Sequence, residues 1–315
     1  MTHTTTESTT AHRVVVGYDT SSGAAQAVWE AAHYARARNL GLTILFSLRD
    51  LDPTASRTAR AVKSDPGYLE ALRRDARACL DDIARQVSEK YPELDVTTAL
   101  LAMNPAGALA SASLDAVLVV VGARGKTDER RAPILGGVST AVIAHAQGPV
   151  LVVPESAAPE ASGPVVIGLQ DAPDALAAAT VAITEAEQRG VPLIAIYAWD
   201  LAPELGDLGS LARLDPVQTH QDLDGMLADL LAPLLVGHED VTIERRVVQG
   251  SARNALVEAS KNASLVVIGS RGLGGFAGLL LGSISRSVTR EAACPVMVVR
   301  NRELSREIPV PADLI

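Results

Sequence analysis

The sequence predicts an α/β protein made of two tandem copies of one five-stranded, parallel-sheet domain. Three observations lead to this fold class. Short runs of Val and Ile alternate with longer Ala- and Leu-rich segments, these runs are uninterrupted by polar residues, and the same order of segments occurs twice in the 315 residues. Strands that alternate with helices form parallel sheets, and continuous apolar runs are typical of strands covered on both faces.

The repeat is visible when three pairs of segments are aligned. HRVVVGYDTS matches GPVVIGLQDA, LDAVLVVVGARG matches KNASLVVIGSRG, and LGGVSTAVIAHAQGPVLVV matches LGSISRSVTREAACPVMVV. The pairs keep their order and are separated by offsets of 151, 147 and 146 residues. We therefore expect a disordered tail over residues 1–11, a first domain over 12–154, a linker over 155–163, a second domain over 164–300 and a C-terminal tail over 301–315.

Each domain is expected to alternate strands with amphipathic, Ala-rich helices such as 22–39 and 174–189. Parallel strands need right-handed crossovers, and ligands of such sheets bind beyond the carboxyl ends of the strands, where the strand order reverses. The predicted strands are 12–18, 42–48, 94–101, 116–121 and 149–153 in the first domain, and 164–169, 192–198, 241–248, 264–268 and 295–299 in the second.

Composition and charge exclude several classes of protein. The net charge of −9 and the pI near 5.2 argue against a nucleic-acid partner, which would need a broad basic surface. No run approaches the roughly 20 apolar residues that cross a bilayer, and the Thr-rich start lacks the apolar stretch of a signal peptide. Cys79 and Cys294 support neither a disulfide framework nor a zinc cluster. We expect a cytoplasmic protein with no membrane partner.

The most informative segment runs from Gly269 to Ser285, between the fourth strand and the last helix of the second domain. Its glycines leave backbone N–H groups uncovered. Gly282 and Ser283 stand at the start of the helix, where free amides and the helix dipole favour an anion. Arg271 could add a charge-assisted bond to a phosphate. The structural alternative is that the glycines form a turn and Ser283 is an N-cap.

Two other phosphate-binding patterns match this sequence only in part. Gly272, Gly274 and Ala277 give G-x-G-x-x-A, but this follows the fourth strand and has no acidic residue after the next one. GARGKT at 122–127 ends like a phosphate loop, but its first Gly is misplaced. Both interpretations are rejected.

The motifs resemble the universal stress protein family in its tandem form. Gly269-x2-Gly272-x9-Gly282-Ser283 fits the ATP-binding signature of that family, and VVVGYDTS and VVIGLQDA resemble its first strand. VVQGSARNAL resembles its third-strand exit, where Gly250 would lie close to the nucleotide. The resemblance implies Rossmann-like, adenine nucleotide alpha hydrolase-like domains that form dimers or tandem pairs. It also implies a ligand, ATP or another adenine nucleotide, which can bring Mg²⁺ with it.

By this resemblance the second domain keeps the phosphate side of the site, and Ala198 matches a position whose backbone lies near adenine. The first-strand Asp of the family is replaced by Gln170, which can still form hydrogen bonds, and Asp171 could substitute for the missing charge. The expected nucleotide-binding residues are Gln170, Asp171, Ala198, Gly250, Gly269, Arg271, Gly272, Gly282, Ser283 and Ser285.

In the first domain, the residue after the first strand is kept and the phosphate side of the site is altered. This domain keeps the first-strand Asp, but its loop is charged, Gly137 replaces the signature Ser, and Met103 replaces Gly250. The bulk of Met and the missing N–H of Pro133 make a triphosphate harder to place. We read a degraded second site. Its candidate residues are Asp19, Ser21, Gly122, Gly125, Gly136 and Ser139, the last expected to cap the helix. Lys126, Arg130 and Arg131 could bind a different anion, but we favour a solvated charged loop for them.

No constellation of residues predicts catalysis. The six His lack metal-ligand spacing, and Ser22 and Ser270 lack the context of a nucleophile. The main prediction is an ATP-binding stress-response or regulatory protein, and the alternatives are a scaffold with non-binding sites and a weak ATPase. The apolar fifth strands, PVLVV and PVMVV, invite edge pairing. We expect an internal pseudo-dimer of the two domains, and a homodimer of chains remains plausible.

Overall fold

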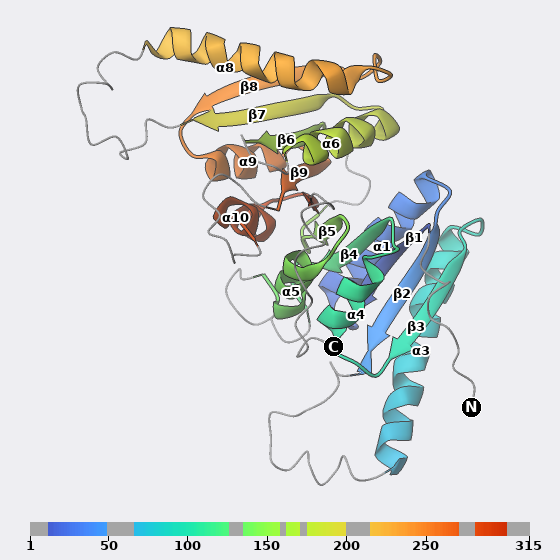
Figure 1. The fold of residues 1–315 in the computed structure, drawn as a ribbon. Helices are drawn as coiled ribbons and strands as arrows, with labels where there is room; N and C mark the ends of the chain where they lie inside the picture. The colour runs from blue at the N-terminus through green and yellow to red at the C-terminus, as the bar shows by residue number, and fades with distance from the viewer. Residues whose placement is uncertain are drawn as a thin grey trace. The chain divides into compact units, whose positions relative to one another are not determined.

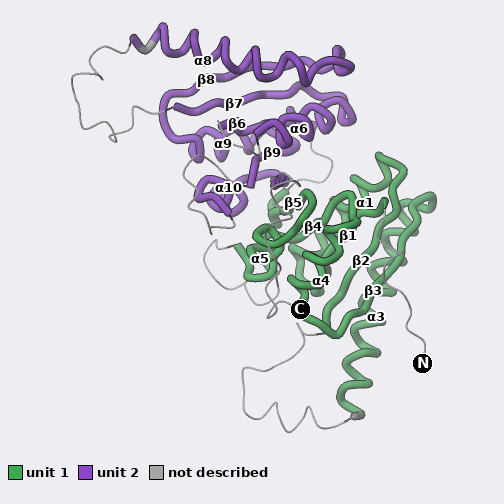
Figure 2. Tube along the Cα trace, viewed as in Figure 1, with its two compact units in different colours: residues 1–160, 302–315 green, residues 161–301 purple. Residues whose placement is uncertain are grey.

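The computed structural model describes residues 12–48, 66–125, 135–157, 162–170, 175–199, 215–270 and 281–300. The chain divides into two compact units (Figure 2), unit 1 comprising Met1–Glu160 with Arg302–Ile315 and unit 2 comprising Ala161–Asn301. Each unit holds one run of alternating strands and helices (Figure 1), which confirms the predicted fold class.

Unit 1 has five parallel strands in the order β3-β2-β1-β4-β5. Helices α1 and α3 pack on one face of this sheet and α4 and α5 on the other. The strand order reverses between β1 and β4. The elements are β1 (Arg13–Tyr18), α1 (Ser22–Ala37), β2 (Gly41–Ser47), α3 (Pro66–Lys90), β3 (Val96–Leu101), α4 (Pro105–Ala112), β4 (Leu118–Gly122), α5 (Gly137–His145) and β5 (Val150–Val153).

Unit 2 repeats this arrangement with the order β8-β7-β6-β9-β10, so that its strand order reverses between β6 and β9. Helices α6 and α8 pack on one face and α9 and α10 on the other. The elements are β6 (Val165–Leu169), α6 (Ala175–Arg189), β7 (Leu193–Trp199), α8 (Pro216–Leu231), a 3-10 helix η3 (Ala232–Leu235), β8 (Ile243–Gln249), α9 (Ala252–Ser260), β9 (Leu265–Gly269), α10 (Ser283–Glu291) and β10 (Val296–Val299).

The central strands form the core of each unit. Every residue of β4, β5 and β10 is buried, as the continuous apolar runs predict. Gly17 and Gly168 occupy the same place in the two units, and each lets a helix approach its sheet closely. A Cβ at Gly17 would lie 2.9 Å from Leu109 in α4, and one at Gly168 would lie 2.7 Å from Leu256 in α9.

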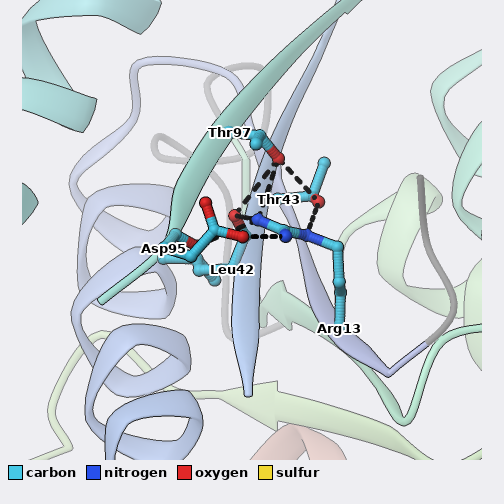
Figure 3. Close-up of polar contacts among 5 residues, drawn as sticks. All are labelled: Arg13, Leu42, Thr43, Asp95 and Thr97. Carbon is cyan, nitrogen blue, oxygen red and sulfur yellow. Dashed lines mark hydrogen bonds and ion pairs between the residues drawn. The ribbon is translucent and has the colours of Figure 1, made fainter. Parts of the chain in front are cut away.

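Arg13 joins the beginnings of three strands in unit 1 (Figure 3). Its guanidinium donates to the Thr43 hydroxyl at 3.0 Å, to the Leu42 carbonyl at 2.8 Å and to the Thr97 hydroxyl at 3.1 Å. It also bonds the side chain and the carbonyl of Asp95. Gly41 leaves room for this group, because a Cβ there would collide with it. The clamp uses all three guanidinium nitrogens, so we read it as structural.

Candidate functional site

The carboxyl end of β9 is joined to the start of α10 by two hydrogen bonds. The Ser285 hydroxyl donates to the Gly269 carbonyl at 2.8 Å, and the Gly282 N–H donates to the Ser270 carbonyl at 2.9 Å. Ser270 and Ser285 are both buried. The strand end and the helix start are therefore held in a fixed relation on either side of residues 271–280, which lie outside the described part of the chain.

This helix start presents unused backbone donors. Gly282 is the N-cap of α10, makes no side-chain capping bond and accepts from Arg286 N–H through its carbonyl. Among the described residues, the amides of Ser283, Ile284 and Ser285 have no acceptor, and the Ser283 hydroxyl has no partner. Free amides at a helix N-terminus, where the helix dipole is positive, bind anions.

Two sequence interpretations of this segment need correction. Ser283 is the first helical residue and not the N-cap, so the structural alternative for its hydroxyl does not hold. The Gly282 N–H is already bonded to Ser270, so the unused donors begin one residue later. Asp171, Arg271 and Gly272, three of the predicted nucleotide-binding residues, lie outside the described residues.

The remaining predicted residues of unit 2 gather at the carboxyl edge of its sheet. Gln170 follows β6, Ala198 is the penultimate residue of β7, and Gly250 follows β8. The Gly250 N–H donates to the Trp199 carbonyl at 2.8 Å, which closes the end of the β7–β8 pair. Gly250 has a φ of +120°, a conformation that favours Gly. A Cβ at Gly250 would meet no atom of the described residues within 4 Å, so they leave the space beside it open.

Unit 1 brings its candidate residues together around Asp19. The Asp19 carboxylate accepts from the Ser21 N–H at 3.0 Å and from the Ser21 hydroxyl at 2.6 Å. The same hydroxyl accepts from Ala24 N–H and so caps α1. The other carboxylate oxygen lies 2.6 Å from where a Cβ of Gly125 would be. A carboxylate thus faces the backbone that leaves β4.

The start of α5 repeats the geometry of α10. Gly136 is the N-cap, and its N–H donates to the Ala123 carbonyl at 2.8 Å. The expectation that Ser139 caps this helix is wrong, because its hydroxyl donates to the Gly122 carbonyl at 2.6 Å. As the third residue of the helix, Ser139 instead joins α5 to the end of β4. Lys126, Arg130, Arg131 and Pro133 lie outside the described residues.

The end of β2 in unit 1 differs from its counterpart in unit 2. The Ser47 hydroxyl donates to the Met103 carbonyl, and Met103 occupies the place of Gly250. In unit 2, Ala198 has no hydroxyl to form this bond, and Gly250 has no side chain. The ends of the second and third strands therefore carry the Ser47 and Met103 side chains in unit 1 and the smaller Ala198 and Gly250 in unit 2.

Tyr18 lies beside the unit 1 cluster at the end of β1, with its ring edge-on to Phe46. Burial raises the pKa of the Tyr18 phenol, and the negative charges available at Cys79, Asp82 and Asp19 raise it further. The phenol therefore stays protonated at neutral pH and is a hydrogen-bond donor there.

Sequence reasoning missed two residues at the unit 2 edge. The Ser270 carbonyl accepts the Gly282 N–H, and the indole nitrogen of Trp199 is buried without a hydrogen-bond partner among the described residues. Backbone acceptors carry no signature in sequence. A Trp at a strand end is equally typical of an ordinary core position.

The described residues contain no group of three or more His, Cys, Asp or Glu side chains placed to hold a metal ion. None of the helices in the described part of the chain is both long and apolar enough to span a bilayer.

Sequence and structure comparisons with known proteins agree on one family. A universal stress protein from Mycolicibacterium smegmatis is 34% identical over 309 residues, which cover 94% of this chain and 99% of that protein. The crystal structure of a universal stress protein from Archaeoglobus fulgidus has the same fold, with a TM-score of 0.67, 18% identity and coverage of 93% of this chain and 99% of that one. A universal stress protein solved in complex with cAMP aligns with 44% of this chain and 95% of its own, at 27% identity and a TM-score of 0.33.

The family model described as the universal stress protein family matches this chain twice, over residues 10–154 and 162–300. The two matches fall on the two sheets with the same strand order. The chain therefore belongs to the universal stress protein family and carries two copies of its domain.

Proposed function

We propose that this protein is an adenine-nucleotide-binding regulatory protein, with ATP as the ligand and unit 2 as the main site. The observation that carries the proposal is the set of three successive amides at the start of α10 that have no acceptor among the described residues. The bonds of Ser285 and Gly282 to the end of β9 hold these amides in place before any ligand arrives. Preorganised donors of this kind suit a phosphate group.

The rest of the ligand would extend across the carboxyl edge from α10 toward β7. Gln170 at the end of β6 offers an amide for the ribose or the base, and the backbone of Ala198 lies at the end of the neighbouring strand. The open space beside Gly250 gives room that Met103 removes in unit 1. Mg²⁺ would arrive with the phosphates, since it needs only one or two protein oxygens.

We propose that binding itself is the function, through a change of conformation or partner. Pairing of the two units as a pseudo-dimer, dimerisation of the chain and a cytoplasmic location remain part of this proposal.

The test is mass spectrometry of the small molecules released from purified protein. Gly282→Val is a clean variant, because φ −67° and ψ 154° at this residue suit a β-branched side chain. Its isopropyl group would cover the neighbouring amides. Gly136→Val is the matched control in unit 1, with φ −61° and ψ 153°. We expect adenine nucleotide from the wild type and from Gly136→Val, and little from Gly282→Val. Equal amounts from all three proteins would refute the placement of the phosphates.

A further inference from the structure

A buried hydrogen-bond donor without an acceptor lies at the same edge of unit 2. Trp199 is the last residue of β7, and its indole nitrogen has no hydrogen-bond partner among the residues that the structure describes. A buried donor left unpaired costs about 1–3 kcal/mol, and such groups are rare in native proteins. An indole N–H can only donate, so whatever satisfies it must be an acceptor.

The surroundings of Trp199 place it next to the proposed nucleotide site. It follows Ala198, and its own carbonyl accepts from the N–H of Gly250, beside which the space is open. Strand alternation directs its side chain away from Gly168 and α9, and toward the face that carries α6. Helix α6 begins shortly after Gln170. Trp199 and Gln170 therefore flank the same part of the sheet edge.

The spacing of the strands fits a nucleotide that begins at α10. Strands β9, β6 and β7 are successive neighbours, and each step between strands is about 4.8 Å. The end of β7 is thus about 10 Å from the end of β9 along the edge. Phosphates at the start of α10 would leave the ribose and the base to cover this distance. The ring nitrogens of adenine and the oxygens of ribose are acceptors.

We propose that the indole N–H of Trp199 donates a hydrogen bond to the nucleoside part of the ligand bound in unit 2. This inference rests on the proposed function. It adds Trp199 as a residue that favours ligands with a hydrogen-bond acceptor at one position. Unit 1 lacks the donor, because the strand pairing places Leu48 where unit 2 has Trp199.

The two tryptophans of the chain make the experiment direct. Trp29 lies in α1 of unit 1, so in Trp29→Phe all tryptophan fluorescence comes from Trp199. We expect ATP to change the emission of Trp29→Phe. In calorimetric titrations with ATP, Trp199→Phe keeps an aromatic ring but loses the N–H, and should bind about tenfold more weakly than the wild type. Trp29→Phe should bind like the wild type.

Thermal unfolding separates a ligand contact from a structural role. Removing an unpaired N–H breaks no hydrogen bond in the free protein and relieves the cost of the buried donor, which offsets packing lost with the smaller ring. Trp199→Phe should therefore unfold near the wild-type temperature without ATP and gain less stability when ATP is added. Unchanged ATP affinity in folded Trp199→Phe would overturn this inference and leave the proposed function standing. Absence of ATP binding by the wild type would overturn both.

Discussion

The hydroxyl of Ser285 bonds the carbonyl oxygen of Gly269 at 2.8 Å, and Ser139 bonds Gly122 in the same way at 2.6 Å. Each bond joins the third residue of a helix to the last residue of the strand before it. After a shared Arg-Gly pair, the loop between them is charged in unit 1 and rich in glycine in unit 2. The fold therefore fixes the position of the helix start by a contact that does not depend on the loop.

Ser285→Ala should lower both stability and nucleotide affinity. The variant removes one buried hydrogen bond, which is worth about 1 kcal/mol, and frees the start of α10 from the end of β9. Ser139→Ala loses the equivalent bond in unit 1 and is the matched control. Denaturant unfolding should show a similar loss for both, whereas titration with ATP should show a several-fold loss only for Ser285→Ala. Equal ATP affinities for the two variants would place the ligand elsewhere.

The strands, the parallel sheet and the repeat could be predicted from sequence, because uninterrupted apolar runs such as LVVV and LVVI are typical of strands covered on both faces. The hydrogen-bond partners of individual hydroxyl groups could not be predicted. Ser139 fits the residue type of an N-cap, but a helix that begins two residues earlier turns it toward Gly122. Whether the indole nitrogen of Trp199 has a hydrogen-bond acceptor depends on residues that are distant in the sequence. The residues next to Trp199 therefore do not predict that this nitrogen is buried without a partner.

Gly122→Ala should destabilise unit 1 much more than Gly17→Ala. A Cβ at Gly122 would lie 2.8 Å from the backbone carbonyl of Gly23, which cannot move without shifting the start of α1. A Cβ at Gly17 would lie 2.9 Å from the end of the Leu109 side chain, which can change rotamer. We expect a loss of about 2–3 kcal/mol for Gly122→Ala and under about 1 kcal/mol for Gly17→Ala, measured by denaturant unfolding. The reverse order would contradict the close backbone packing at the end of β4.

The Arg13 clamp predicts that this residue cannot be replaced by another cation. Arg13→Met keeps the apolar stem but removes the guanidinium bonds to the Thr43 and Thr97 hydroxyls and to the Leu42 carbonyl, and should cost about 2–3 kcal/mol in unfolding free energy. Arg13→Lys should recover less than half of this loss, because one ammonium cannot reach partners on three strands. Unit 2 has Pro164 where unit 1 has Arg13, so the stability of unit 2 is the reference with which the loss in unit 1 is compared. Full recovery by Lys would show that charge alone matters.

The ion pair between Asp224 of α8 and Arg245 of β8 predicts a pH dependence in unit 2. Arg245 donates to the two carboxylate oxygens at 2.8 and 3.0 Å, and these hydrogen bonds lower the pKa of Asp224 below its ordinary value of 3.8. A carboxyl whose pKa is lower in the folded state adds stability above its unfolded pKa and loses it as the pH falls through the folded value. The advantage of the wild type over Arg245→Met should be constant at neutral pH, begin to shrink as the pH approaches 3.8, and vanish only below the lowered pKa of the folded state.

Arg246→Met is the control for this titration, because Arg246 pairs with Glu244 on its own strand and does not reach α8. Its effect should begin to decline at a higher pH, because the ordinary pKa of Glu244 is 4.5, and the bond to Arg246 lowers this pKa in the folded state. Carboxyl-carbon NMR shifts of Asp224 would follow its protonation directly. A carboxyl that titrates at 3.8 in the wild type and is unmoved by Arg245→Met would mean that the pair is not formed in solution. In that case the packing of α8 would depend on its buried apolar residues, which include Leu227 and Leu231.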